Sequence, residues 1–194
     1  MKMSEGKDLC AFCRTPPPGS NEERANRTKK LMDNGNDEAF NILGGYYDKG
    51  IKGFSQDYQK ANELYLKAGQ VGSANGYLNL GNNYRQGRGV EVDINKANHY
   101  FELAAMYGSV SARYNLGCME LNVGNRTGNF QQAFKHFMIS ARAGFKESLD
   151  MVKEGFMKGD VTKEEYANTL RAYHERHKEM KSDERDKAEA SGMF

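Results

Sequence analysis

The chain has 194 residues, enough for one large or two small domains, and its 38% hydrophobic and 28% charged residues are typical of a globular protein that folds in water. Its 28 basic and 26 acidic residues give a net charge of only +2, which disfavours nucleic-acid binding because no large positive field attracts phosphates. Three cysteines are too few for a disulfide scaffold, and the sequence contains no membrane-length apolar span and no apolar secretion leader, so we expect an intracellular, cytoplasmic or nuclear protein.

The first predicted segment, residues 1–19, is a linker that contains a cysteine pair. Cys10 and Cys13 form a C-x-x-C motif, and the three prolines that follow favour an extended, disordered chain. Two cysteines are half of a four-ligand zinc site. The stretch LCAFCRTPPPGS resembles the end of a RING finger, the zinc module of many ubiquitin ligases, although Ala11 stands where that pattern has proline. The resemblance implies a zinc cofactor only if the missing ligands lie upstream, in a longer protein of which this chain is a fragment.

The next predicted element is a helix over residues 20–35. Ser20 and Glu23 have the spacing of a capping box, and Leu31 and Gly35 fall where the end of a helix is expected. Because this helix precedes the first complete repeat, we expect it to act as a half-repeat cap.

Residues 36–158 contain a repeat of about 36 residues. Each unit contains a leucine-glycine pair. Further along the unit there is an aspartate or asparagine, and an alanine follows it four residues later. The glycines are Gly44, Gly81 and Gly117, the polar residues are Asp57, Asp93 and Asn129, and the alanines are Ala61, Ala97 and Ala133. This register predicts units at 37–72, 74–108 and 110–144, and a partial unit at 146–159.

Each unit is predicted to be helix, turn, helix. Apolar residues recur at helical spacing in the first helix, as at Phe40, Leu43 and Tyr47, and Asp57 has the position of an N-cap for the second. A glycine in the middle of a helix costs about 1 kcal/mol relative to alanine unless the missing side chain is needed. We therefore expect the paired helices to cross closely at these glycines, with aromatic rings filling the layers between units.

The segments LGGYYDKG, DYQKANELYLKAG, LGNNYRQGRGV and DINKANHYFELAAMYG resemble the Sel-one-like repeat, whose consensus is LGxxYxxGxGVxxDxxKAxxYxxKAAxxG. The resemblance covers roughly residues 37–150. It implies an all-α, right-handed solenoid of antiparallel helix pairs, similar to tetratricopeptide repeats, that serves as a protein-interaction scaffold. Glu120 departs from the pattern, because the first two units have an aromatic residue there, and NVGNRTGN alters the turn of the third unit.

The last predicted element, residues 160–190, is a capping helix. Thr162 and Glu165 have the spacing of a capping box, and one narrow apolar stripe, which includes Tyr166, Leu170 and Tyr173, runs through an otherwise charged segment. A polar outer face is what the last helix of a solenoid requires.

The sequence contains no nucleophile, P-loop or zinc-protease motif, so we expect no enzymatic activity. Stacked helix pairs bend into an array with a concave inside lined by first helices. Six polar residues of those helices are candidates for binding the backbone or acidic groups of a protein or peptide partner: Asn79, Asn82, Asn83, Arg85, Arg113 and Asn115. The alternative for Asn79 and Asn115 is a structural bond to a neighbouring turn.

The prediction is therefore a protein-interaction scaffold or adaptor without cofactor, monomeric or weakly self-associating through its terminal helices. The alternative is the substrate-recruiting fragment of a RING-type ubiquitin ligase whose zinc module is truncated in this chain.

Overall fold

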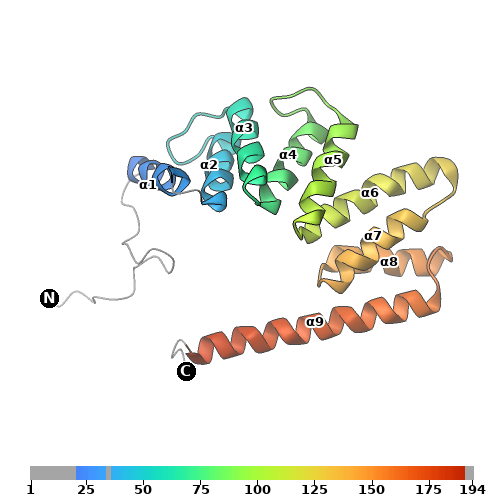
Figure 1. Ribbon diagram of the computed structural model, residues 1–194. Coiled ribbons are helices and arrows are strands. Elements are labelled where there is room, and N and C mark those ends of the chain that lie inside the picture. The colour runs from blue at the N-terminus through green and yellow to red at the C-terminus, as the bar shows by residue number, and fades with distance from the viewer. Residues whose placement is uncertain (1–20, 34–35, 191–194) are drawn as a thin grey trace.

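The computed structural model describes residues 21–33 and 36–190, and these ranges contain nine helices and no strand. The helices follow one another as a curved stack, with a long last helix running back along its length (Figure 1). They are α1 (Asn21–Asp33), α2 (Asp37–Lys49), α3 (Tyr58–Gln70), α4 (Ala74–Gln86), α5 (Ile94–Met106), α6 (Val110–Thr127), α7 (Gln131–Arg142), α8 (Lys146–Lys158) and α9 (Lys163–Ala190). The predicted all-α array of helix pairs is confirmed.

The helices pack as consecutive pairs. α2 with α3, α4 with α5, and α6 with α7 form three units, and each second helix also packs against the first helix of the next unit. α1 packs against α2, and α8 and α9 pack against α7. The proposed linker over residues 1–19, with Cys10 and Cys13, and the Ser20 side of the predicted capping box lie outside the described residues.

Aspartate caps start the second helices of the first two units. Asp57 accepts a hydrogen bond from the backbone N–H of Lys60 at 3.0 Å, and Asp93 accepts one from Lys96 at 2.9 Å. The third unit differs, because α6 has 18 residues whereas α4 has 13, and this leaves a short turn. There the N-cap position falls on Phe130, and Asn129 instead accepts a hydrogen bond from the N–H of Gln131 at 3.1 Å.

The predicted close crossings occur at the mid-helix glycines. A Cβ atom at Gly81 would lie 2.8 Å from the Phe101 ring and 3.2 Å from the carbonyl oxygen of Ala97. Gly44 faces Tyr65 and Gly117 faces Phe137 in the same way. Each ring therefore lies over the glycine of its own unit, rather than only between units as the sequence predicted.

The core continues from one unit to the next. One buried cluster joins α4, α5 and α6 and contains Tyr77, Phe101 and Leu116, and another joins α7 and α8 and contains Phe137 and Val152. Phe101 and Phe137 are fully buried, and burial of large apolar side chains is the main source of stability in such a core. Stability is therefore shared between neighbouring units.

A buried polar link ties the second unit to the first. The amide of Asn83 on α4 donates to the side-chain oxygen of Asn62 on α3 at 2.7 Å, and the Asn62 amide donates to the carbonyl oxygen of Arg88 at 2.8 Å. Arg88 lies in the turn after α4, and its guanidinium is 3.9 Å from the Asp48 carboxylate of the first unit. The turn of one unit is thus fixed to the unit before it.

This link predicts a difference between two equivalent asparagines. We expect Asn62→Ala to lower the free energy of unfolding by about 1–3 kcal/mol, because it leaves the buried Asn83 amide and the Arg88 carbonyl without partners. Asn98 stands at the same position of the next unit, but its buried side-chain oxygen has no hydrogen-bond partner, so Asn98→Ala should be close to neutral. Urea denaturation of both variants measures this difference, and equal losses would contradict it.

The capping box predicted before α9 is present. The N–H of Glu165 donates to the Thr162 hydroxyl oxygen at 3.2 Å, and the Glu165 carboxylate accepts from the Thr162 N–H at 2.9 Å. The hydrogen bond from that N–H, and then the one from the Thr162 hydroxyl, lower the pKa of Glu165.

A pH-dependent stability follows from this carboxylate. Because its pKa is lower in the folded state than the unfolded value of about 4.3, its contribution is complete above that value and is lost as pH falls through the folded pKa. We expect Glu165→Gln to destabilise the protein by about 0.5 kcal/mol at pH 7 and by nothing at pH 2. Glu164→Gln, in the same helical turn, is the matched control. A loss of stability in Glu165→Gln that is as large at pH 2 as at pH 7 would contradict the prediction.

Candidate partner-binding surface

Three of the predicted binding residues of α4 share one side of that helix. The amide of Asn79 donates to the side-chain oxygen of Asn41 on α2 at 2.9 Å, so it spans two consecutive first helices. Asn82, one turn further, accepts a hydrogen bond from the Arg85 guanidinium at 3.2 Å. Residues three apart share one face of a helix, so these three side chains form one surface, which we call the α4 face (Asn79, Asn82 and Arg85).

Arg85 extends the α4 face toward α6. Its side chain is exposed, and its guanidinium carbon lies 6.0 Å from the centroid of the Phe101 ring. Its charge also acts on Cys118 of α6. Burial raises the pKa of Cys118, whereas its hydrogen bond with Tyr114 and the nearby charge of Arg85 lower that pKa. The α4 face therefore combines amide groups, which can bond a peptide backbone, with one cation.

Three of the six predicted residues, Asn83, Arg113 and Asn115, do not lie on the α4 face. Asn83 is only 3% exposed and holds the buried link to Asn62, so its side chain is not available to a partner. The prediction of Asn83 as a surface residue is wrong because helical spacing alone did not show which polar side chain turns inward. Arg113 lines a separate pocket beside Ile139 of α7 and Ala143, the residue after that helix.

Arg113 and Asn115 point to different sides of α6, because residues two apart on a helix do not face each other. Asn115 is half-buried. Asn79 makes a structural hydrogen bond, which was the predicted alternative to partner binding. Its acceptor is Asn41 on helix α2 rather than a neighbouring turn.

Sequence reasoning missed the pocket around Arg113. Its other lining residues, such as Ile139, Ser140 and Ala143, carry no binding motif. The repeat nevertheless carries a signal for this pocket. Ala143 stands 36 residues after Tyr107, so the third unit has a small side chain where the second unit has a large one.

The described residues show no metal centre and no membrane span. Within residues 21–33 and 36–190, no three His, Cys, Asp or Glu side chains gather as metal ligands would. No helix in these same ranges is both long and apolar enough to cross a bilayer. The zinc half-site predicted at Cys10 and Cys13 falls outside this part of the chain.

Comparison with known proteins identifies the repeat. The family model "Sel1 repeat" matches residues 39–73, 74–109 and 110–145, one match for each structural unit. A sel1-like repeat-containing protein of Acanthamoeba polyphaga mimivirus is 35% identical over 80 residues, which are 41% of this chain and 14% of that protein. HRD3B of Arabidopsis thaliana, an ERAD-associated E3 ubiquitin-protein ligase component, is 35% identical over 104 residues, 53% of this chain and 16% of that protein.

Solved structures share the fold. A protective antigen of uropathogenic Escherichia coli with an SLR fold matches with a TM-score of 0.69 at 23% identity, over 85% of this chain and 35% of the antigen. A Sel1 repeat protein from Oxalobacter formigenes matches with a TM-score of 0.64 at 22% identity, over 80% of this chain and 64% of that one. The chain thus spans only a small part of the two curated relatives and shares its architecture with both solved proteins.

Proposed function

The chain belongs to the Sel1 repeat family, and from this premise we propose that it is a non-enzymatic adaptor that holds other proteins through the surfaces of its helix pairs. The observation that carries the proposal is the run of three contiguous Sel1 repeats over residues 39–145. Sel1 repeats are helical repeats for protein interaction, and stacking them makes an extended surface rather than an enclosed active site.

We propose the α4 face, together with Asn115 of α6, as one contact surface of the adaptor. The Asn79 amide nitrogen bonds Asn41 and the Asn82 oxygen bonds Arg85, so the groups on offer to the backbone of an extended segment are the Asn79 oxygen and the Asn82 amide nitrogen. Arg85 adds a cation that favours an acidic residue in the partner.

The absence of catalysis is part of the proposal. A nucleophilic cysteine needs a lowered pKa, whereas burial raises the pKa of Cys118. Buried tyrosines such as Tyr65 also have raised pKa values because burial disfavours their charged form. Neither environment prepares a group for chemistry at neutral pH. The cytoplasmic location and the monomeric state stay predictions from the sequence.

A second candidate function is a recruiting component of a ubiquitin ligase complex. The similarity to HRD3B, which is named as an E3 ligase component, favours it. This candidate does not require the chain itself to contain a zinc module, so it differs from the RING fragment predicted at Cys10 and Cys13.

The test is affinity capture with a matched pair of triple variants. One variant carries Asn79→Ala, Asn82→Ala and Arg85→Ala, and the other carries Gln59→Ala, Glu63→Ala and Lys67→Ala on the exposed side of α3. We expect proteins retained by the native chain and by the α3 variant to be lost from the α4-face variant. Retention by both would contradict the α4 face as the contact, and ubiquitin-ligase subunits among the retained proteins would favour the second candidate.

A further inference from the structure

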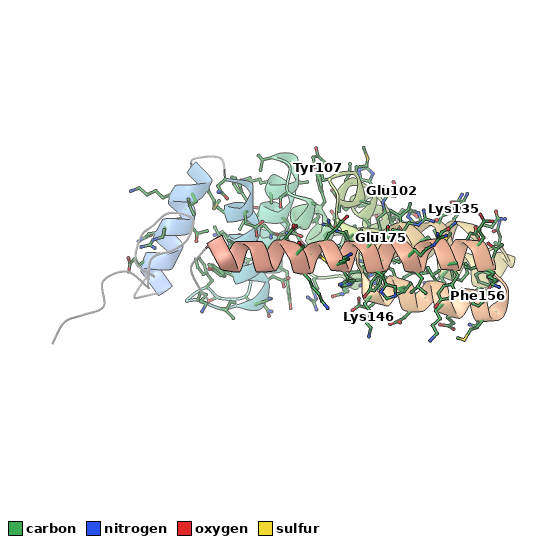
Figure 2. The ribbon with its side chains drawn as sticks, turned by 90° about the horizontal axis from the view of Figure 1, so that it is seen from below. Glu102, Tyr107, Lys135, Lys146, Phe156 and Glu175 are labelled. Atoms are coloured by element: carbon green, nitrogen blue, oxygen red, sulfur yellow. The ribbon has the colours of Figure 1, made fainter. Side chains whose placement is uncertain are left out.

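A pocket of about 200 Å³ lies between α5, α6 and α7. Arg113 of α6, Ile139 of α7 and Ala143 just after α7 line it, together with the turn at Gly108 and Ser109. The lining residue Ile139 is 48% exposed, and Met106 and Tyr107, which stand between the lining residues Ala105 and Gly108 in the chain, are 77% and 52% exposed. Figure 2 shows Glu102 of α5, Tyr107 just after α5 and Lys135 of α7 along the same side of α9. The pocket therefore opens beside an exposed apolar rim.

The second repeat fills the equivalent place with its own side chains. There, 36 residues earlier, Tyr77 and Tyr107 stand at the positions of Arg113 and Ala143, and the two tyrosine rings contact each other with centroids 5.8 Å apart. The backbone conformation at the end of the second helix is nearly the same in both repeats, with φ −82° and ψ 14° at Tyr107 and φ −81° and ψ 4° at Ala143. The pocket thus lies where the second repeat has two aromatic side chains and the third repeat has an arginine and an alanine.

The third repeat also replaces the adjacent aromatic pair. Tyr84 and Tyr100 stack with centroids 5.4 Å apart in the second repeat, and their equivalents are Glu120 and His136. Burial lowers the pKa of His136, and the nearby Arg113 lowers it further, whereas Glu120 and Glu102 raise it. A layer of packed rings has become a layer of polar groups beside the pocket.

Arg113 carries a charge that the described part of the chain does not neutralise. Its side chain is half-buried, and it forms no ion pair and no hydrogen bond with the described residues. Glu102 and Glu120 act on His136 but are not paired with Arg113. A half-buried guanidinium binds most strongly to a carboxylate, which it can hold by two parallel hydrogen bonds.

We propose that this pocket binds an aromatic side chain of a partner protein that has an acidic residue next to it. The ring would occupy the space that tyrosines fill in the second repeat, and the acidic residue would pair with Arg113. A cavity of about 150 Å³ is known to hold a benzene ring, so the pocket is large enough for one aromatic side chain. This inference rests on the proposed adaptor function and names a chemical class of partner for it.

The test is an NMR titration of the full chain with three capped peptides. The probe is Gly-Asp-Tyr-Gly, and the comparisons are Gly-Asn-Tyr-Gly, without the charge, and Gly-Asp-Ala-Gly, without the ring. We expect the probe to shift the backbone amides of Gly108, Val110 and Gly144, and to bind at least about tenfold more tightly than either comparison. Equal affinity for the three peptides, or no shift at these amides, would overturn the proposal.

Two substitutions locate the binding. Ala143→Tyr restores the side chain of the second repeat and should weaken the probe at least about tenfold, whereas Val71→Tyr, at the same position of the first repeat and 51% exposed, should leave it unchanged. Arg113→Gln should remove the preference for the aspartate probe over the asparagine probe. This second variant keeps the test decisive if Ala143→Tyr lowers the helical content of the chain.

The failure of this inference is distinguishable from the failure of the adaptor function. If Ala143→Tyr captures the same proteins as the native chain, the pocket is not the docking site but the adaptor function stands. If Ala143→Tyr instead changes the sedimentation of the chain alone, the occupant is a second copy, which contradicts the proposal.

Discussion

Truncation of Phe101 to alanine is expected to lower the free energy of unfolding by about 3–5 kcal/mol. The side chain has no exposed surface, and its ring covers Gly81 at the centre of the second unit. It also belongs to the buried cluster that joins α4, α5 and α6. Because each repeat is stabilised mainly by its neighbours, the loss removes support from both sides of the middle unit.

Urea denaturation followed by circular dichroism measures the effect of Phe101→Ala. Met106→Ala is the control on the same helix, because Met106 is 77% exposed and its truncation should change stability by less than about 0.5 kcal/mol. A loss below about 2 kcal/mol for Phe101→Ala would show that the middle unit is not held by this ring.

Gly89→Ala is expected to cost about 3 kcal/mol. Gly89 has φ +67°, a left-handed conformation that costs a residue with a Cβ about 1–2 kcal/mol. Its Cβ would in addition lie 2.6 Å from Cβ and 2.7 Å from the carbonyl carbon of Tyr58, the first residue of α3. Backbone atoms cannot rotate away as a side chain can, so the turn would have to leave α3.

Gly108→Ala separates these two effects. Gly108 also has a positive φ, +88°, but nothing lies within 4 Å of the Cβ it would gain. We therefore expect Gly108→Ala to cost only the conformational part, about 1–2 kcal/mol, in the same denaturation experiment. Equal losses for the two variants would mean that the contact between the Gly89 turn and α3 contributes nothing.

Local and repeated features could be predicted from the sequence. Asp57 and Asp93 act within three residues of their own positions, and Gly44 and Gly81 recur at a fixed place in each unit. Caps and crossings of this kind follow from helix geometry and from the 36-residue register. The cap at Asn129 is displaced because α6 is longer than the other first helices, which no local signal indicated.

Contacts that are not repeated could not be predicted. Asn83 bonds to Asn62, 21 residues earlier, and its equivalents in the other units are Tyr46 and Met119, so the register gave no indication of this pair. Arg113 is different, because its two-residue offset from Asn115 already places it on another side of α6. The six predicted binding residues therefore do not form one surface, because they lie on different faces of their helices.

The last helix has a mechanical consequence. α9 has 28 residues, about 42 Å at 1.5 Å per residue, and it packs mainly on α7 and α8 and passes the turn between them near Arg176 and Met180. A tilt of about 10° at its start would move Ala190 by about 7 Å over that length. α9 is therefore a lever arm, which converts a small rotation at the end of the stack into a large displacement along its side.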